Sequence, residues 1–423
     1  MKRAYVKDIK TGEVVLIKGW IYELRDLAKL KFILLRDTSG IVQCVVKDKK
    51  LMKKFSKLTL ESVIEVKGKV KKADIKAEFV RRDVEVEVND LKILNKAERL
   101  PIQVNLKTER SSLPTRLDNR SLDIRKPKIK AIFKIQGEIA NSFREFFYNK
   151  GFLEVQLPSI ILSSSEGGTE LFSVDYFGKK AYLAQSPQLY KQMLACSVER
   201  VFTLSPVWRA EKHNTIRHLN ESRQMDIEMA FAGQMEVMKE LELAVQYIVK
   251  NVLEKSKSEL ELLKVKLKVP KAKYLSYDEC VKLLGMKYGE DFTPEDEKKL
   301  DKKFPDTIVF VHSWPSKLKP FYILPKDGKA DEKLSEGFDA IYKGMEISSG
   351  GQRIHIPELL IQRLKAKKLN PKNFKSYVDS FRFGAPPHAG WSIGLERLTQ
   401  LVTGQTNIRE AVLFPRDRTR LTP

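Results

Sequence analysis

The first hundred residues carry a strand pattern. Apolar and polar residues alternate in five short segments rich in β-branched side chains: Val14–Leu24, Phe32–Arg36, Ile41–Lys47, Val63–Val70 and Val84–Leu94. A helical stretch, Lys49–Lys57, falls between the third and fourth segments. Five strands with a helix in this position predict an OB-fold barrel over residues 1–95, on which single-stranded bases stack against aromatic side chains. A small β-barrel that binds another kind of partner would show the same pattern.

Residues 96–127 lose this periodicity. They contain prolines and a polar segment with three arginines, Arg116, Arg120 and Arg125. We interpret this segment as a polar spacer in a hinge between two domains, although a solvated linker without a ligand fits equally well. Beyond it, apolar residues recur at helical spacing from Lys128 to Asn149, and a strand, Phe152–Leu157, leads to a proline.

A charged hairpin is the strongest feature of the remaining chain. Val201–Val207 and Met225–Phe231 predict two strands joined by a polar loop. Arg209 lies where the first strand ends, and Asp226 and Glu228 share one face of the second because strand side chains alternate. A guanidinium, two carboxylates and a basic loop suit a nucleotide triphosphate. In an arbitrary hairpin, the same charges would merely keep the surface solvated.

Two glycine-rich segments near the C-terminus add further candidate chemistry. Glu346 and Ser349 lie three residues apart beside two glycines, and a carboxylate with a hydroxyl is half of a magnesium site. Taken alone, Glu346 would more often be a strand carboxylate paired with a lysine. A second segment turns at Gly394 into a helix that carries Glu396 and Arg397, so its N-terminus can face a phosphate. The long stretch 233–325 shows mixed, charged segments to which we assign no chemistry.

Composition narrows the classes of protein that remain. The 423 residues exceed a single ordinary core and predict two or more domains, and the formal charge of +23 favours a polyanionic partner such as nucleic acid. The three cysteines are far apart, which argues against a disulfide framework or a zinc site. Long apolar runs and a signal-like N-terminus are not found, so we expect a soluble, cytoplasmic protein without a membrane partner.

Several of these segments resemble the class II aminoacyl-tRNA synthetases. PVWRAE followed by RHL and DIEMAF looks like motif 2 of that family, and SIGLER looks like motif 3. The helix and strand that end at Pro158 resemble motif 1, which implies a homodimer. AEKHNTIRHLNE, QSPQLYKQ and SSSEGGTELF are similar to the archaeal-type aspartyl enzymes, and GWIYELRDLAKLKFILLRDTSGIVQ is similar to their anticodon-binding domain. The implied catalytic domain, 128–423, is an antiparallel sheet flanked by helices, giving an α+β protein.

The resemblance implies an ATP-dependent ligase that attaches L-aspartate to the 3′ end of tRNA(Asp) through an aspartyl-adenylate. It leaves open whether tRNA(Asn) is also charged. It assigns ATP binding to Arg209, Ala210, Glu211, Arg217, His218, Leu219, Glu346, Gly394, Leu395, Glu396 and Arg397, with Arg209 and Arg397 catalytic. It assigns aspartate binding to Glu166, Gln188, Leu189, Tyr190, Lys191, Arg209, Asp226, Ser349 and Arg353. Mg²⁺ would be held by Glu346 and Ser349, and the anticodon by Arg25, Phe32 and Gln43, while the arginines of the spacer would contact the tRNA body.

Two positions depart from the family pattern. Ser222 stands where many members have a phenylalanine that stacks on adenine, and Trp391-Ser392 replaces Phe-Gly before motif 3. A guanidinium stack by Arg223, or repacking by Trp391, would compensate. Two other classes of function are kept in view. One is a paralogue that only binds nucleic acid, and the other is an asparagine synthetase built on the same catalytic domain, although such relatives lack the OB domain.

Overall fold

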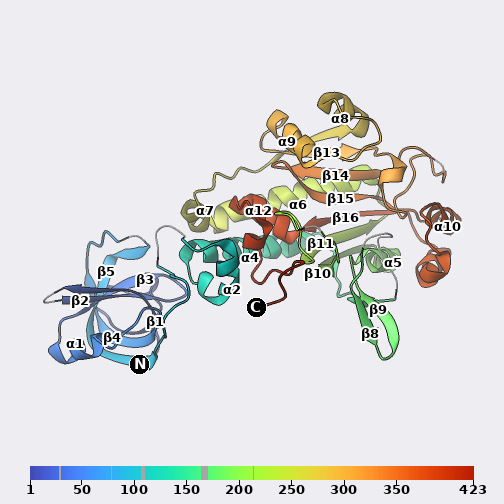
Figure 1. Cartoon of the computed structure of the whole chain (residues 1–423). Coiled ribbons are helices and arrows are strands. Elements are labelled where there is room, and N and C mark those ends of the chain that lie inside the picture. The colour runs from blue at the N-terminus through green and yellow to red at the C-terminus, as the bar shows by residue number, and fades with distance from the viewer. Residues whose placement is uncertain (28–29, 78, 106–109, 163–169, 213, 331) are drawn as a thin grey trace. The chain divides into compact units, whose positions relative to one another are not determined.

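The computed structural model describes residues 1–27, 30–77, 79–105, 110–162, 170–212, 214–330 and 332–423. The chain divides into two compact units, residues 1–127 together with residue 423, and residues 128–422 (Figure 1). Each unit has its own hydrophobic core. The three cysteines, Cys44, Cys196 and Cys280, are free. Within the described part of the chain, no helix combines the length and the apolar character needed to cross a membrane.

The first unit contains the expected barrel. Five strands close in the order β1-β2-β3-β5-β4. Their bounds, with the helix between β3 and β4, are β1 (Val14–Leu27), β2 (Leu30–Arg36), β3 (Ile41–Val46), α1 (Lys49–Phe55), β4 (Val63–Lys72) and β5 (Val80–Asn95). All neighbours are antiparallel except β3 and β5. The side chain of Asp48 starts α1 by accepting from the backbone N–H groups of Lys50 and Leu51.

The prediction of a polar spacer over Arg116–Arg125 is wrong, because this segment is mostly helical. It forms α2 (Leu113–Asp118) and α3 (Arg120–Asp123). The carboxylate of Asp123, fully buried, accepts from Arg116 at 3.1 Å and from Arg120 at 2.7 Å. These two arginines are therefore buried in a structural ion cluster. The charge pattern had suggested solvation, but it reflects pairing within the fold.

The second unit is built on a sheet of eight strands in the order β12-β13-β14-β15-β16-β11-β10-β6. The pairs β12–β13 and β10–β6 at its two edges are parallel and the others antiparallel, so the sheet is mixed and not wholly antiparallel as expected. Its strands are β6 (Leu153–Glu154), β10 (Arg200–Trp208), β11 (Glu221–Ala230), β12 (Lys271–Ser276), β13 (Thr307–His312), β14 (Gly337–Tyr342), β15 (Met345–Gln352) and β16 (His388–Gly394). The motif 1 strand predicted over Phe152–Leu157 is wrong in extent, since β6 pairs only with Val201 and Phe202 before Pro158 ends the extended run.

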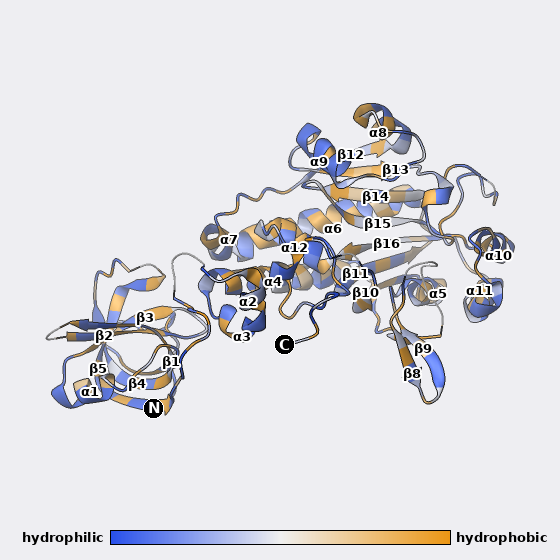
Figure 2. Cartoon of the chain, in the orientation of Figure 1, coloured by the Kyte–Doolittle hydropathy of each residue, from blue (hydrophilic) through white to orange (hydrophobic). Residues whose placement is uncertain are grey.

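Helices cover both faces of this sheet. Helices α4 (Pro127–Asn149), α6 (Gln234–Lys255) and α12 (Leu395–Thr403) contribute to the main core together with β10, β11 and β13–β16. Figure 2 shows apolar and polar residues alternating along α6, whose apolar side packs on the sheet. The other face leaves room for the candidate site. Near it, α5 (Gln188–Val198) contacts β10, β11 and β16.

The remaining elements flank this core. A separate three-stranded sheet is formed by β7 (Ile160–Ile161), β9 (Lys179–Leu183) and β8 (Ser173–Tyr176), in that order. The other helices are α7 (Lys257–Leu263), α8 (Tyr277–Leu284), α9 (Pro294–Lys303), α10 (Pro357–Ala366) and α11 (Lys375–Arg382). Short 3-10 turns span Ser316–Leu318, Pro371–Phe374 and Ile408–Ala411. Helices α8 and α9 pack with β12, β13 and β14 around a small core of their own.

Candidate functional site

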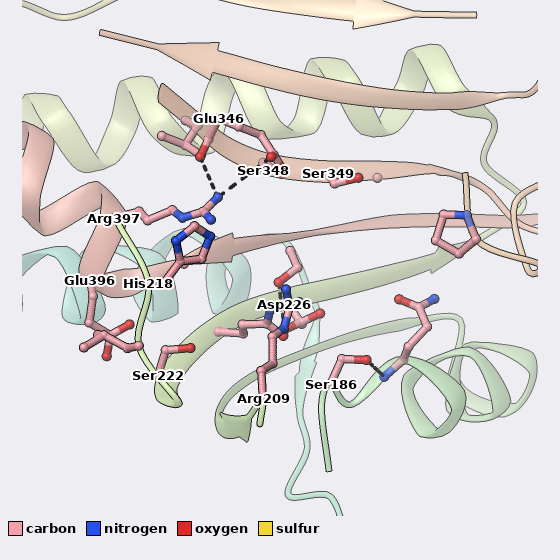
Figure 3. A pocket seen from close by; sticks show the side chains of 18 of the residues that line it. Ser186, Arg209, His218, Ser222, Asp226, Glu346, Ser348, Ser349, Glu396 and Arg397 are labelled. Carbon is pink, nitrogen blue, oxygen red and sulfur yellow. Dashed lines mark hydrogen bonds and ion pairs between the residues drawn. The ribbon is translucent and has the colours of Figure 1, made fainter. Parts of the chain in front are cut away.

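A polar cavity of about 290 Å³ opens on the face of the eight-stranded sheet opposite α6 (Figure 3). Its walls come from β11, β15 and β16, the loop between β10 and β11, and the start of α12. Charged and polar side chains dominate the lining: Ser186, Gln188, Arg209, Glu211, Arg217, His218, Ser222, Gln224, Asp226, Glu346, Ser348, Ser349, Arg353, Ser392, Glu396 and Arg397. Segments from four separate parts of the sequence therefore form one site.

The period of two along β11 sorts its side chains between cavity and core. Ser222, Gln224 and Asp226 line the cavity, whereas Met225 and Ile227 are fully buried against the helices behind the sheet. Gln224 can be found from the sequence, because it shares this strand face with Asp226. Its side-chain carbonyl has no hydrogen-bond partner among the described residues, and neither has the buried hydroxyl of Ser348.

Arg209 stands at the end of β10, where the hairpin loop begins. Its backbone N–H donates to the carbonyl of Asn220 at 3.0 Å. The side chain of Asn220 donates in return to the carbonyls of Arg209 and Glu211, at 2.6 and 3.0 Å. The Arg209 side chain is 39% exposed, and its guanidinium lies 3.8 Å from the Glu211 carboxylate. A well-held backbone thus presents an accessible cation to the cavity.

A second arginine, Arg397, lies where α12 begins. Arg397 points towards Glu346 in Figure 3 and donates to its backbone carbonyl at 3.0 Å, with the Glu346 carboxylate 3.9 Å away. Surrounding protein atoms and the nearby Asp339 carboxylate raise the pKa of Glu346 to about 7. Asp339 lies opposite Ser349 in the register of β14 and β15 and pairs with Lys319.

These groups fit a divalent cation. Glu346 and Ser349 both line the cavity, as oxygen ligands should. Burial is the larger cause of the raised Glu346 pKa and the Asp339 carboxylate the second, and a bound cation would offset both by favouring the charged form of Glu346. The two residues that the sequence pairs as a half-site are therefore placed on one wall by β15.

Beneath the cavity lies a buried network of two cations and two carboxylates, of which Asp226 and Arg353 also line the cavity. Lys191, only 1% exposed, donates to Asp226 at 2.8 Å and lies 3.5 Å from Glu228. Arg353 donates to Glu228 through Nε at 2.9 Å. Burial alone would raise the pKa of Glu228, but Arg353 and Lys191 outweigh it and lower that pKa. The hydroxyl of Ser392 donates to Asp226 at 3.2 Å.

Neither of the replacements suggested for the missing adenine-stacking ring lines the cavity. Arg223 alternates with Ser222 and Gln224 and pairs with Glu221 at 3.0 Å, so its side chain is absent from the lining. Its backbone N–H donates to both oxygens of Glu396, at 3.1 and 3.0 Å. Trp391 is fully buried, with its ring 5.6 Å from that of Phe147 in the core. Because side chains alternate along a strand, both side chains point away from the cavity.

The structure brings most of the predicted ATP and aspartate residues to this cavity. Among the described residues, those that do not line it are Ala210, Leu189, Tyr190, Lys191 and Leu395. Lys191 nevertheless joins the site through Asp226. Glu166 lies outside the described residues. The sequence did not predict the roles of Ser348 and Tyr322 as lining residues, and neither lies in a distinctive motif beyond the proximity of Ser348 to Ser349.

The barrel has its own cavity, of about 580 Å³. It is lined by Tyr22, Glu23, Arg25, Gln43, Asp74, Ile75, Lys76, Ala77, Phe79 and Asn105. Arg25 donates to Glu23 at 2.7 Å and the amide of Gln43 donates to Glu85 at 2.9 Å. Phe32 lies opposite Arg25 across β1 and β2 and is half-buried, but it does not line this cavity.

The sheet brings arginines, a glutamate and a helix N-terminus together around one polar cavity, and the same chain carries an OB-fold barrel. This combination defines the architecture of a class II aminoacyl-tRNA synthetase. Comparison with known families agrees. Residues 112–418 match the model described as tRNA synthetases class II (D, K and N), and residues 15–94 match the OB-fold nucleic acid binding domain. The chain belongs to the class II tRNA synthetases of the D, K and N group.

Individual relatives match over the whole chain. It is 44% identical to the aspartate–tRNA(Asp/Asn) ligase of Methanocaldococcus jannaschii, covering 99% of this chain and 98% of the relative. It is 40% identical to the aspartate–tRNA(Asp) ligase of Thermoplasma volcanium, covering 100% of both. Among solved structures, the asparaginyl-tRNA synthetase from Pyrococcus horikoshii complexed with asparaginyl-adenylate is 34% identical, with a TM-score of 0.94 over 100% of both chains.

Proposed function

We propose that this chain is an aspartate–tRNA ligase that activates L-aspartate with ATP and transfers it to the 3′ end of tRNA(Asp). The observation that carries the proposal is the arrangement of the cavity. Arg209, Arg217 and Arg397 surround one end, while Lys191 and Arg353 lie beneath or beside the other. Cations at both ends suit a triphosphate and a dicarboxylic amino acid. The full-length aspartate ligase relatives support the same choice of substrate.

In the first step, the α-carboxylate of aspartate attacks the α-phosphorus of ATP, and pyrophosphate leaves as the aspartyl-adenylate forms. The carboxylate is already ionised at pH 7, so the step needs positioning and charge stabilisation and no general base. Arg209 would bridge the attacking carboxylate and the α-phosphate. Arg217 and His218 would hold the γ-phosphate, and Glu211 would accept from the adenine amino group.

Aspartate would lie at the floor of the cavity. Its side-chain carboxylate would meet Lys191 and Arg353, and Asp226 would orient its ammonium group, with Gln188 beside them. Both cations are already paired with protein carboxylates, at 2.8 and 2.9 Å. Binding would therefore add a third carboxylate to a network whose charges balance. Arg397 would lie against the adenine, next to the phosphate chain.

We assign the metal as Mg²⁺ bound with ATP. Glu346 and Ser349 would hold it, and the cation would supply charge neutralisation for the phosphates. The residues of the chain provide the fixed part of the site, because β15 places both ligands on one wall and Arg397 donates to the backbone of Glu346.

In the second step, the terminal ribose hydroxyl of the tRNA attacks the carbonyl carbon of the aspartyl-adenylate and accepts the aspartyl group, while AMP leaves and the hydroxyl proton is lost. The barrel, 1–95, would bind the anticodon through Arg25, Phe32 and Gln43. Residues 96–127 would connect the domains, and residues 128–423 would carry catalysis with an insertion at 233–325.

We place the protein in the cytoplasm as a homodimer formed through the motif 1 region. Exposed apolar side chains there, Tyr148, Leu153 and Ile160, support that interface.

Aspartate-dependent exchange of labelled pyrophosphate into ATP tests the activity. We expect exchange with aspartate and added Mg²⁺, followed by charging of tRNA(Asp) transcripts. A parallel assay with tRNA(Asn) transcripts would establish whether the second tRNA is also a substrate. Binding of tRNA without exchange would instead indicate a nucleic-acid-binding paralogue, and aspartate amidation without tRNA charging would indicate an asparagine synthetase.

Replacing Phe32 with alanine should weaken tRNA binding without affecting adenylate formation. A base stacked on an aromatic ring contributes about 1–3 kcal/mol, and Phe32 is half-buried on the barrel surface. Filter binding of tRNA and pyrophosphate exchange would measure the two effects. Tyr5→Ala, at an exposed aromatic in the same unit, is the matched control. If circular dichroism shows an unfolded barrel, Phe32 is a core residue and the assignment to the anticodon fails.

A further inference from the structure

The insertion between motifs 2 and 3 contributes a residue, Glu297, that contacts two of the residues lining the proposed ATP end of the cavity. Helix α9 begins at a capping box in which Thr293 and Asp296 exchange hydrogen bonds. One position further on, Glu297 is part-buried, with 12% of its side chain exposed. Its neighbours Glu295 and Lys298 are exposed. Glu297 therefore faces the sheet and not the solvent.

Both carboxylate oxygens of Glu297 are used. One accepts from Nη1 of Arg217 at 2.5 Å, and the other accepts from the backbone N–H of Glu346 at 3.2 Å. Arg217 also donates through Nη2 to the carbonyl of Gly344 at 3.2 Å. A single side chain thus connects the loop between β10 and β11 to the strand that bears Glu346. The two guanidinium nitrogens of Arg217 donate to different acceptors, Glu297 and the Gly344 carbonyl, and together these bonds fix the plane of the guanidinium more strongly than one contact would.

The turn between β14 and β15 rests on the same helix. Gly344 has φ +70°, and a Cβ added there would lie 3.4 Å from Lys298. The α9 backbone therefore packs closely against the turn that precedes Glu346. Three parts of the ATP end, namely Arg217, the turn and the start of β15, share one support.

We propose that Glu297 is a positioning residue for ATP, acting through Arg217 and Glu346. This inference rests on the proposed function, which places the triphosphate against those two residues. Without the Glu297 carboxylate, the Arg217 guanidinium would keep, among the residues that the structure describes, the hydrogen bond to Gly344 and would sample other rotamers. The loss should weaken the interaction with the phosphates and leave the aspartate end unchanged. The insertion then contributes to ATP affinity and is more than a peripheral elaboration.

The test is Glu297→Gln, which keeps the size of the side chain and removes its charge. We expect the KM for ATP in pyrophosphate exchange and the Kd for Mg·ATP from calorimetry each to rise about tenfold, as for loss of one charge-assisted hydrogen bond. The KM for aspartate should stay within about twofold. Glu297→Asp, which restores the charge, should recover part of the loss. Glu295→Gln removes the same charge from an exposed position of α9 and is the matched control, expected to behave as wild type.

A double-mutant cycle with Arg217→Ala identifies the route of the effect. Because Glu297 is proposed to act largely through Arg217, Glu297→Gln should weaken ATP binding much less in the Arg217→Ala background than the tenfold expected in the wild type, and the remaining loss belongs to the contact with Glu346. Unchanged or tighter ATP binding by Glu297→Gln, or an equal rise in the KM values of ATP and aspartate with a lowered Tm, would overturn the inference. Calorimetry with ATP keeps the two proposals separate: a wild-type chain that binds ATP but does not activate aspartate refutes the proposed function and still permits this test.

Discussion

Arg209→Ala should abolish aspartyl-adenylate formation while tRNA binding stays nearly intact. The guanidinium stands at the end of β10 with an accessible surface and a backbone held by Asn220. A donor preorganised for a transferring phosphoryl group is worth about 3 kcal/mol, or roughly a hundredfold in rate. Pyrophosphate exchange measures the first property and filter binding of tRNA the second.

The matched control for Arg209 lies three residues away. Lys212 is 75% exposed and pairs with Glu170 at 3.1 Å, so Lys212→Ala removes a cation from the same loop without reaching the cavity floor. It should retain exchange within about twofold. Equal loss of exchange and of tRNA binding in Arg209→Ala would contradict the role that we assign to it, because the two functions are proposed to reside in different domains.

Lys191→Leu should raise the KM for aspartate by about a hundredfold and change the KM for ATP little. The ammonium group is buried and held by Asp226 and the carbonyl of Trp391, at 2.8 and 3.1 Å. In the proposed pocket this ammonium group would face the side chain of the substrate and favour a carboxylate over a neutral amide. For the same reason, asparagine should support only about 1% of the wild-type exchange rate, since its amide would leave charged donors partly unpaired.

The Lys191 variant needs a stability control. Replacing Lys191 removes the ammonium group that faces Asp226 and Glu228. Breaking a buried ion pair in this way costs about 3–5 kcal/mol of stability. Thermal unfolding would show whether the variant remains folded at the assay temperature. Lys239→Leu, at a lysine that is 57% exposed and pairs with Glu242, serves as the surface control. An unchanged aspartate KM, or comparable exchange with asparagine, would refute the pocket assignment.

Local patterns predicted the barrel and the hairpin well, because each depends on alternation that burial enforces. The five barrel strands, the helix between the third and fourth, and the β10–β11 hairpin were all confirmed. Boundaries were less accurate. The last barrel strand begins at Val80 and not Val84, since Arg81 and Arg82 obscure the alternation there.

The errors and omissions arise from tertiary contacts. The sequence around Arg116 and Arg120 predicted a polar spacer, although both arginines donate to a buried carboxylate. The partners of Lys191 and Arg353 could not be predicted, because sheet register and the packing of α5 decide which acid each cation meets. Glu297 lies 80 residues from Arg217 in sequence, within a charged helix that resembles many exposed ones. Its role becomes visible only once the helix is placed on the sheet.

Trp391 connects the hydrophobic core to Lys191, which we propose to be part of the amino-acid pocket. Its ring packs against Phe143 and Phe147 of α4, while its carbonyl accepts from Lys191 on the opposite side of the sheet. Closely packed interiors transmit small displacements. A change of side-chain volume at Phe143 or Phe147 should therefore shift one of the hydrogen bonds that hold the lysine. If Lys191 selects the amino acid as proposed, substitutions in the interior of the fold can adjust that choice, and evolution has more routes to a new specificity than the pocket lining suggests.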